Sequence, residues 1–576
     1  MLHSIQRWLE NFRLKISRPD AILPLSVMGL IAGTLAALTI IALRLLVDYV
    51  QVELLPINVA EDFESMSSAW RLGAPLAGGL LIGLLFRLTR EDTHSVGIPH
   101  ILERLAHHQG RLTWGNAIVQ FVGGAITMIA GHSVGREGPS AHLGAASSNL
   151  PAQALRFPNN SLRVLAACGA AAGIAASFNT PLAGAAFAME VLLMEYTVAG
   201  FAPVILATVS ATALTQAVFG SDLAYDVPSM SLGALTELPF ILVCGVLIGL
   251  LAGGFNALFQ WISERGQKLP IWARPMLAGL LVGVCGVMVP EVMGIGDDTV
   301  DRMLRGEAAF TLLLIILVVK IIATTGGIGL GLPGGIIGPT LFIGAAAGGL
   351  LGAVGATLGI NEVSSLGLYA MIGMGAMMAG SLQAPMAGLI AIMELTGSTS
   401  LIFPGMLAVV AATIAGGYIG RRESVFHSLL RARGLDYRND PMAQSLRRIG
   451  VASVMNRRVV VLSRQVTSAE ADKALAGQPS WILVRGTEQA DVLLAAIDLV
   501  RVRKEAPDEE HYDLLAMPGE RLQTRPIDMG ATLQEAQQMI EKSGAEALIV
   551  VSQTVPGIPR LLGVLTPADI ENSYHY

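Results

Sequence analysis

The chain has 576 residues, of which 53% are hydrophobic and 14% are charged, and its mean hydropathy is +0.59. Soluble domains average about 25% charged residues, so this composition excludes an ordinary soluble protein and predicts a membrane protein. The net charge of −6 is spread along the chain, and we expect no nucleic-acid partner. Cys168, Cys244 and Cys285 have neither metal-ligand nor disulfide spacing, so no metal site is expected.

The first 21 residues form a basic segment before the first apolar span. Four basic side chains favour a cytoplasmic N-terminus: Arg7, Arg13, Lys15 and Arg18. No small-residue cleavage site follows them, so the segment does not resemble a signal peptide. Charge-free segments of membrane-spanning length occupy residues 22–43, 164–189, 196–221 and 238–263. A bilayer core needs about 20 apolar residues, and roughly ten or more helical segments fit before residue 420.

Three Gly/Pro-containing breaks interrupt the apolar sequence: SVGIP at residues 95–99, GREGP at 135–139 and GGIIGP at 334–339. A helix that begins inside the membrane leaves its first N–H groups without intrahelical partners, and its dipole adds positive potential there. Such helix starts bind anions when the irregular backbone lines a cavity rather than lipid. The three breaks together therefore predict an anion site.

The membrane part also repeats itself. SFNTPLAGAAFAMEVLL begins at Ser177 and matches SLQAPMAGLIAIMELTG, which begins at Ser381. Pro139 and Pro339, in the last two breaks, are 200 positions apart, and Pro181 and Pro385 are 204 apart. Repeated halves with interrupted apolar segments at matching positions are typical of a transport site built from broken helices.

Glu137 places a carboxylate inside the second break. Among amides that attract anions, an ionised carboxylate can occupy the place of the anion and block its path. Once protonated it loses that attraction and can move away. An ion pair between Glu137 and Arg136 is the alternative, although adjacent residues seldom face each other on a helix.

These motifs, in this order, resemble the CLC family of chloride channels and proton/chloride exchangers, over roughly residues 22–426. The resemblance implies an inverted-repeat, all-helical membrane domain that works as a homodimer with one pore per subunit. It implies that Glu137 is the gating glutamate. Further residues are implied as anion-binding, around the main-chain N–H groups of a central and an outer site: Val96, Gly97, Ile98, Arg136, Gly138, Ile336, Ile337, Gly338 and Phe426.

The chain departs from the family pattern at three positions. Val96 and Phe426 stand where the family usually has an anion-coordinating serine and tyrosine, so two hydroxyls are missing, and Ser95 is the alternative hydroxyl. Weaker central binding is expected, because a hydrogen bond to a charged partner contributes about 1.5–3 kcal/mol. Nitrate or fluoride preference is therefore an alternative to chloride. Val191 stands where exchangers commonly carry an inner glutamate, which favours channel-like or loosely proton-coupled flux.

A second domain follows the membrane part. We expect a linker at residues 421–450 and a cytoplasmic α/β domain at 451–576, because short apolar strands there alternate with amphipathic helices. This domain looks like two consecutive cystathionine-β-synthase-type (CBS) modules. Thr566 and Asp569 match positions that hold ribose or phosphate in nucleotide-binding members. Adenine-nucleotide binding and a purely dimerising role both remain open.

The predicted fold class is thus an all-α multispanning membrane protein with a C-terminal α/β domain. The membrane domain spans residues 22–420, with repeats at about 22–220 and 235–420. The predicted function is CLC-type anion transport gated by protonation and movement of Glu137, in the inner membrane of a bacterium, with both termini cytoplasmic. The alternatives are proton/chloride exchange and, in another class, a membrane sensor that signals through the CBS pair. The chain lacks HExxH, a P-loop and CxxC, and no enzyme is expected.

Overall fold

A computed structural model of the chain describes residues 2–225, 230, 232–360, 364–419, 423–435, 441–485, 491–507, 509–555 and 558–573. Part of the predicted linker, residues 421–422 and 436–440, lies outside the described residues. The chain forms two compact units. The helical unit comprises Leu25–Ala154 and Arg163–Tyr437, and the C-terminal unit comprises Met1–Pro24, Leu155–Leu162 and Arg438–Tyr576.

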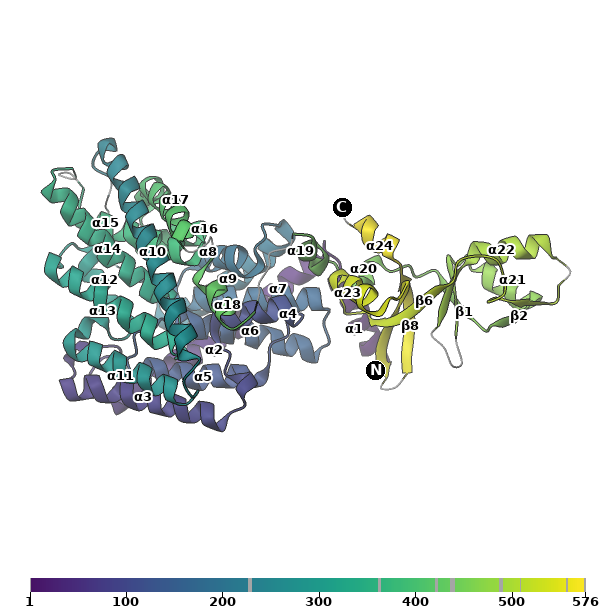
Figure 1. Cartoon of the computed structure of the whole chain (residues 1–576), viewed down its shortest axis with the longest axis horizontal. Coiled ribbons are helices and arrows are strands. Elements are labelled where there is room, and N and C mark those ends of the chain that lie inside the picture. The colour runs from purple at the N-terminus through teal and green to yellow at the C-terminus, as the bar shows by residue number, and fades with distance from the viewer. Residues whose placement is uncertain are drawn as a thin grey trace. The chain divides into compact units, whose positions relative to one another are not determined.

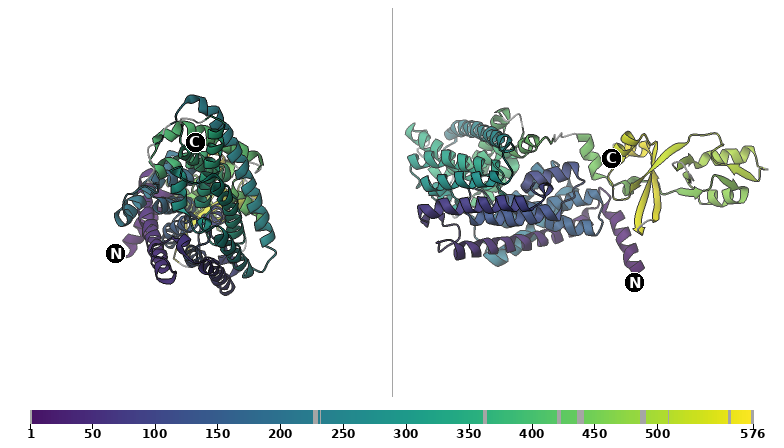
Figure 2. Two further views of the ribbon diagram at one scale, coloured as in Figure 1. Left: turned by 90° about the vertical axis from the view of Figure 1, so that its left-hand side faces the viewer. Right: turned by 60° about the horizontal axis from the view of Figure 1, so that its bottom comes forward.

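The described elements of the helical unit are helices throughout, as Figures 1 and 2 show. In lipid no water is available to the backbone N–H and C=O groups, so these groups must bond within a helix. The side chains of the long helices are mostly apolar, as a lipid surrounding requires. The elements of this part of the chain are α2 (Ile22–Leu54), η1 (Phe63–Ser65), α3 (Ser68–Leu88), η2 (Glu91–Thr93), α4 (Gly97–His107), α5 (Trp114–Ile129), α6 (Glu137–Ala154), α7 (Asn159–Phe178), α8 (Pro181–Phe187), η3 (Ala188–Leu193), α9 (Val198–Phe219), η4 (Leu235–Glu237), α10 (Leu238–Gly266), α11 (Ala273–Met288), η5 (Pro290–Val292), α12 (Asp297–Leu304), α13 (Phe310–Gly329), α14 (Ile337–Thr357), α15 (Leu366–Leu382), α16 (Pro385–Thr396), η6 (Thr399–Leu401), α17 (Ile402–Ile419) and α18 (Val425–Ala432).

Eight helical segments among the described residues are long and apolar enough to cross a membrane. Many apolar side chains on these helices are exposed, Leu38 at 55% and Leu81 at 53% among them, as expected of a lipid-facing surface. Five shorter apolar helices of 10–17 residues accompany the eight, which accords with interrupted helices. The eight segments are Ile22–Leu54, Ser68–Leu88, Asn159–Phe178, Val198–Phe219, Leu235–Gly266, Phe310–Gly329, Ile337–Thr357 and Thr399–Ile419.

The breaks at GREGP and GGIIGP fold alike and pair with each other. In each repeat a helix ends and a turn of the same pattern follows. The next helix begins two residues after Gly135 in the first repeat and two residues after Gly335 in the second. Gly135 and Gly335 form an antiparallel bridge in which each N–H donates to the other's carbonyl at 2.8 Å. The bridge brings the starts of α6 and α14 together, although they are 200 residues apart.

The second matched pair of segments forms α8, continued by the π-helical segment η3, and α16. Glu394 accepts hydrogen bonds from the N–H groups of Leu182 and Ala183 at 2.9 and 2.7 Å. Glu190 accepts from the corresponding two N–H groups at the start of α16, at 3.0 and 2.7 Å. Each repeat therefore caps the Pro-led helix of the other, because helix starts leave these donors unpaired.

The C-terminal unit contains two modules of the same topology. In the first, β1 and β3 pair in parallel across α21, β3 pairs antiparallel with β4, and α22 follows. In the second, β6, α23, β7, β8 and α24 repeat this order and these pairings. The strands form a six-stranded sheet in the order β1-β3-β4-β6-β7-β8, beside the two-stranded sheet β2-β5. The elements of this unit (Figure 1) are α1 (Leu2–Ile16), α19 (Pro441–Arg448), α20 (Val451–Val454), β1 (Val459–Leu462), β2 (Gln465–Thr467), α21 (Ser468–Ala476), β3 (Trp481–Val484), β4 (Val492–Ala495), α22 (Ala496–Glu505), β5 (His511–Asp513), β6 (Leu522–Asp528), α23 (Leu533–Ser543), β7 (Ala547–Val555), β8 (Ile558–Leu565) and α24 (Pro567–Asn572).

The same unit includes the turn that joins α6 to α7. The N–H of Asn159 donates to the carbonyl of Gly530 at 2.8 Å, and its side-chain amide donates to Glu535 at 3.0 Å. The Ser161 hydroxyl donates to the carbonyl of Ile16 at 2.9 Å. The second module and the end of α1 therefore satisfy polar groups at the start of α7.

Candidate functional site

Glu137 is fully buried at the start of α6, between the two paired breaks. Its Oε1 accepts a hydrogen bond from the N–H of Gly338 at 3.2 Å, while its Oε2 has no hydrogen-bond partner. A Cβ built on Gly135 would lie 2.0 Å from Oε2, and one built on Gly335 would lie 2.2 Å from Oε1. The carboxylate thus fills the gap between two glycines, where a side chain on either residue would displace it.

The side chain of Arg136 is held by carboxylates other than Glu137. Its Nη2 donates to Asp297 Oδ2 at 3.0 Å and lies 3.8 Å from Glu61 Oε2. The hydroxyl of Tyr225 donates to the other oxygen of Asp297 at 3.0 Å. The alternative of a Glu137–Arg136 ion pair is therefore not what the structure shows, and the guanidinium anchors the break instead.

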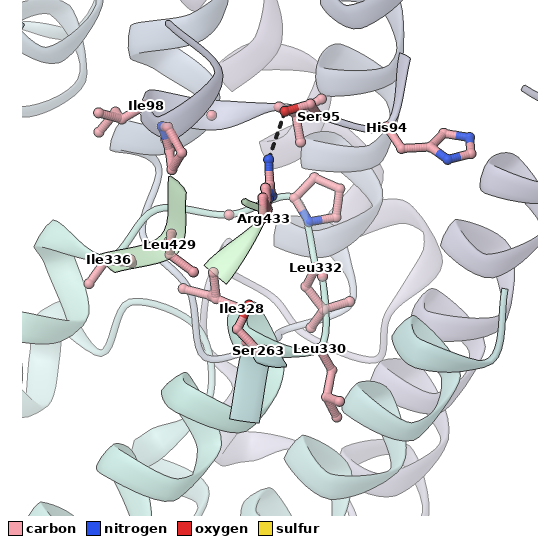
Figure 3. Close-up of a pocket in the computed structure, with 18 of the residues that line it drawn as sticks. His94, Ser95, Ile98, Ser263, Ile328, Leu330, Leu332, Ile336, Leu429 and Arg433 are labelled. Carbon is pink, nitrogen blue, oxygen red and sulfur yellow. Dashed lines mark hydrogen bonds between the residues drawn. The ribbon is translucent and has the colours of Figure 1, made fainter. Parts of the chain in front are cut away.

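A cavity of about 510 Å³ lies next to this gap. Its wall contains six of the predicted residues, contributed by all three breaks and by α18: Val96, Gly97, Ile98, Gly138, Ile336 and Phe426. Figure 3 shows Ile98 and Ile336 on one side of this cavity, near Leu429. Ile337 and Gly338 lie instead at the buried start of α14, where Gly338 bonds Glu137. The predicted residues are thus brought together, apart from the side chain of Arg136.

The two positions that lack hydroxyls have apolar partners. Val96 has an extended backbone and packs against a buried cluster that includes Phe86 and Leu332. Phe426 is 1% exposed and lies edge-on to Phe187, with ring centroids 6.3 Å apart. These contacts explain locally why apolar side chains are accommodated there.

Ser95, the alternative hydroxyl, is already bonded. It accepts from Arg433 Nη1 at 2.7 Å (Figure 3), and it donates to Glu103 Oε2 at 3.2 Å. Sequence reasoning missed Arg433, which follows α18 and places a guanidinium in the cavity wall. The signal was the basic run RARG after the Phe426 segment. A cation in a cleft raises the local concentration of anions.

A pair of buried histidines was also missed. His100 on α4 and His142 on α6 are both 0% exposed, and their rings meet edge to face with centroids 5.1 Å apart. His142 Nδ1 accepts from the N–H of Gly97 at 3.3 Å and lies 3.3 Å from Gln120 Oε1. His100 Nδ1 lies 3.5 Å from Glu103 Oε2. The only signal was one histidine shortly after each of the first and second breaks.

Two other ionisable residues have internal partners. Lys320 is fully buried and donates to the carbonyls of Val292 and Gly294 at 3.0 and 2.9 Å. His132 is buried, and its Nδ1 lies 3.1 Å from the carbonyl of Thr127. Both residues therefore support the fold around the second break.

In the C-terminal unit, Thr566 and Asp569 bond each other. Thr566 is the N-cap of α24, and its N–H and hydroxyl each donate to Asp569 Oδ2 at 2.8 Å. This capping box satisfies donors at the helix start. The nucleotide-binding role of the pair stays a prediction.

Comparison with known proteins identifies the family. The model of the voltage gated chloride channel family matches residues 78–417, more than half of the chain. The chain belongs to this family. A ClcB-like protein of Ralstonia nicotianae is 31% identical over 421 residues, which cover 71% of this chain and 97% of that protein. A Salmonella arizonae protein named as an H+/Cl− exchange transporter, ClcA, is 29% identical over 435 residues, 73% of this chain and 90% of that protein.

The fold of the CLC family is also found by structural comparison. The crystal structure of a eukaryotic CLC transporter superposes with a TM-score of 0.61 at 19% identity, covering 95% of this chain and 97% of that one. The predicted resemblance and fold class are thereby confirmed: this is a multispanning CLC-type anion-transport protein with a strand-containing C-terminal domain. Members of the family are channels or transporters.

Proposed function

We propose that this chain carries chloride, or another small anion, across the inner membrane of a bacterium, and that Glu137 is its movable gate. One observation carries the proposal: the buried Glu137 carboxylate occupies the gap between two paired helix starts, bonded by the Gly338 amide, with its second oxygen unpartnered. An anion in that gap would meet the same amide, because a carboxylate and a halide both accept N–H hydrogen bonds.

The gate works through charge. While Glu137 is ionised, its hydrogen bond to the Gly338 N–H and the positive ends of α6 and α14 hold it in the gap. Protonation removes the charge, so the carboxyl loses an interaction of about 1.5–3 kcal/mol and an anion can replace it. Amides around Glu137, Gly138 and Gly338 then hold the outer anion, and amides near Gly97, Ile98, Ile336 and Ile337 hold the central one.

The cavity supplies charge where the central site lacks hydroxyls. Arg433 lies in its wall, so an anion entering from this side is attracted even though Val96 and Phe426 offer no donor. Selectivity among anions therefore depends on the amides and on Arg433. Nitrate or fluoride is the alternative to chloride as the transported anion.

Transport is channel-like or loosely coupled to protons, because Val191 offers no titratable group on the inner side. Proton/anion exchange is the second candidate, and a specific observation favours it. α4, which carries His100, packs against η3, which holds Val191. A titratable side chain is thus present on the neighbouring element, and the Salmonella arizonae relative is named as an exchanger.

The assembly is a homodimer with one path per subunit and cytoplasmic termini. The two β–α–β–β–α modules of the C-terminal unit are a CBS pair. In it, Thr566 and Asp569 either bind the ribose or phosphate of an adenine nucleotide or simply cap α24 while the pair supports dimerisation. Signalling through this pair without transport is the proposal from a different class.

Flux from proteoliposomes tests the proposal. Wild-type protein and Glu137→Gln are loaded with chloride, nitrate or fluoride, and anion efflux is followed from pH 7.5 to 5.0, with and without a pH gradient. We expect acid to activate the wild type and Glu137→Gln to be open at every pH, with Glu264→Gln on the exposed end of α10 as the matched control.

Three results discriminate the candidates. Unchanged acid activation in Glu137→Gln overturns the gate. Proton pumping driven by an anion gradient replaces the channel-like mode by exchange. If vesicles with the wild-type protein transport none of the three anions, the transport proposal fails and the membrane-sensor function replaces it.

A further inference from the structure

Two contacts of His142 share its Nδ1 atom, and they cannot both be hydrogen bonds at the same time. Its Nδ1 lies 3.3 Å from the backbone nitrogen of Gly97 and 3.3 Å from Oε1 of Gln120. The Gly97 N–H requires a lone pair on Nδ1, whereas the Gln120 oxygen requires a proton there. The protonation state of one imidazole nitrogen therefore decides which contact is a hydrogen bond.

The Gly97 amide is one of those proposed to hold the central anion, and Gly97 lines the cavity. In this structure the amide is donated to His142 instead. Gly97 has a φ of +78°, in the left-handed region that favours glycine, and a Cβ there would make only ordinary contacts, with Pro99 Cδ at 3.7 Å and Gln120 Oε1 at 3.9 Å. Glycine is thus needed for its backbone freedom and not for space, and that freedom lets the Val96–Gly97 peptide turn.

The polar groups around His142 are incompletely paired. His142, Gln120 and His100 are each 0% exposed. Nε2 of His142 and Nε2 of Gln120 have no hydrogen-bond partner, although buried polar atoms are normally paired. The neutral ring satisfies only one of its nitrogens here, and neither of its two states pairs every group.

We propose that His142 links protonation to anion binding, holding the Gly97 amide when neutral and releasing it to the anion when protonated. A proton from the acidic solution adds to Nδ1, so the ring carries protons on both nitrogens. Nδ1–H then donates to Gln120 Oε1, and the N–H of Gly97, left without an acceptor, turns to the cavity. Loss of the proton reverses each step.

The charges around the ring set the direction of the effect. His100 and Arg104, both on α4, oppose a positive charge on His142, so the ring takes up its proton only in acid or beside a bound anion. Glu103 on α4 favours a proton on His100, whereas Arg104 on α4 and Arg433 after α18 oppose it. Gln120, on α5, is uncharged. A protonated His142 adds positive charge behind the anion and frees a donor for it, so acid strengthens anion binding. The inference rests on the proposed function, because it assigns the second half of the same path.

Anion affinity in a Glu137→Gln background tests the switch, because that background removes the titration of the gate. Chloride affinity is measured calorimetrically at pH 7.5 and 5.0 for Glu137→Gln alone and with His142→Gln added. A glutamine offers an acceptor to Gly97 but does not titrate. We expect at least about tenfold tighter binding at pH 5.0 in the first protein, as one hydrogen bond to a charged partner predicts, and none of this gain in the second.

His107→Gln in the same background is the control, since His107 is an exposed histidine on the same helix as His100. Retention of the pH dependence in His142→Gln overturns the switch. If that variant does not fold, the wild type decides: cryo-electron microscopy at pH 5.0 should show Gly97 N turned from His142, and an unchanged contact overturns the proposal. Anion flux is a separate readout, so a wild type that binds chloride in this pH-dependent way but moves none refutes only the proposed function.

Discussion

The two paired breaks have the same backbone and different side chains. Gly135 and Gly335 occupy equivalent positions in one antiparallel bridge, and Pro139 and Pro339 follow at equivalent places. Two residues after the bridging glycine, the first repeat carries Glu137. The second repeat carries an isoleucine there. The starts of α6 and α14 therefore meet at the gap with the same backbone, while only the first repeat places a carboxylate there, the proposed gate.

The other repeated carboxylates behave in the opposite way. Glu190 and Glu394 are present in both repeats and make equivalent contacts to the start of the opposite Pro-led helix. The carboxylates that the repeats share cap helices, whereas the carboxylate that only the first repeat has is the proposed gate. Three sets of substitutions sharpen or break this distinction.

The largest effect is expected from Gly135→Ala. Its methyl group would lie about 2.0 Å from Glu137 Oε2, so the carboxylate must leave the gap while the backbone bridge remains. We expect anion flux at pH 7.5 to rise toward that of Glu137→Gln, and the protein to unfold at lower temperature. In the double variant Gly135→Ala/Glu137→Ala the conflict disappears, so the two sites should be coupled by about 1–3 kcal/mol.

Gly254→Ala is the control for this cycle, because a Cβ on Gly254 meets no atom within 4 Å. If the effects of Gly135→Ala and Glu137→Ala on thermal stability are additive, Glu137 does not occupy the gap between the breaks.

An intermediate effect is expected from Glu190→Gln and Glu394→Gln. Each replaces a charged acceptor of two N–H groups, and each should lower the free energy of unfolding by about 1–3 kcal/mol. Thermal unfolding in detergent measures both. Because the contact distances match, the two losses should be similar, and flux per folded molecule should keep its pH dependence. A change in gating by only one of them would contradict the structural role shared by the repeats.

The smallest effect is expected from Val96→Ser with Phe426→Tyr. The two hydroxyls add donors at the central site and should tighten chloride binding, measured by calorimetry. The gain is partly offset, because Val96 leaves an apolar cluster and the new hydroxyl of residue 426 lies near Phe187. We expect about threefold to tenfold tighter binding, below the full value of two charged hydrogen bonds. No gain would mean that amides already saturate the anion.

Local features of the fold and site were predictable from the sequence. Gly and Pro act on their own backbone, so the breaks at 95–99, 135–139 and 334–339 and the starts of α4, α6 and α14 follow from composition and spacing. The buried position of Glu137 in the gap is shown by the structure, and its role as gate stays a prediction from a charge inside a break, since buried ionisable groups in membranes are normally functional.

Partners distant in sequence were not predictable. Arg136 bonds Asp297 across 161 positions, and Ser95 bonds Arg433 across 338. Gly97 and His142 are 45 apart and meet only because α4 packs against α6. No periodicity or motif encodes such a pair in a single sequence, because tertiary packing selects which of many polar residues meet.

The reciprocal caps of α8 and α16 also set an order of events during synthesis. The acceptor of the Leu182 and Ala183 N–H groups is Glu394, which is synthesised 212 residues after Leu182 and 211 residues after Ala183. Until then the first half of the membrane domain has an open helix start with no acceptor in lipid. The nascent chain can insert its early helices, but the start of α8 is capped only after the second half has been synthesised and has packed against the first.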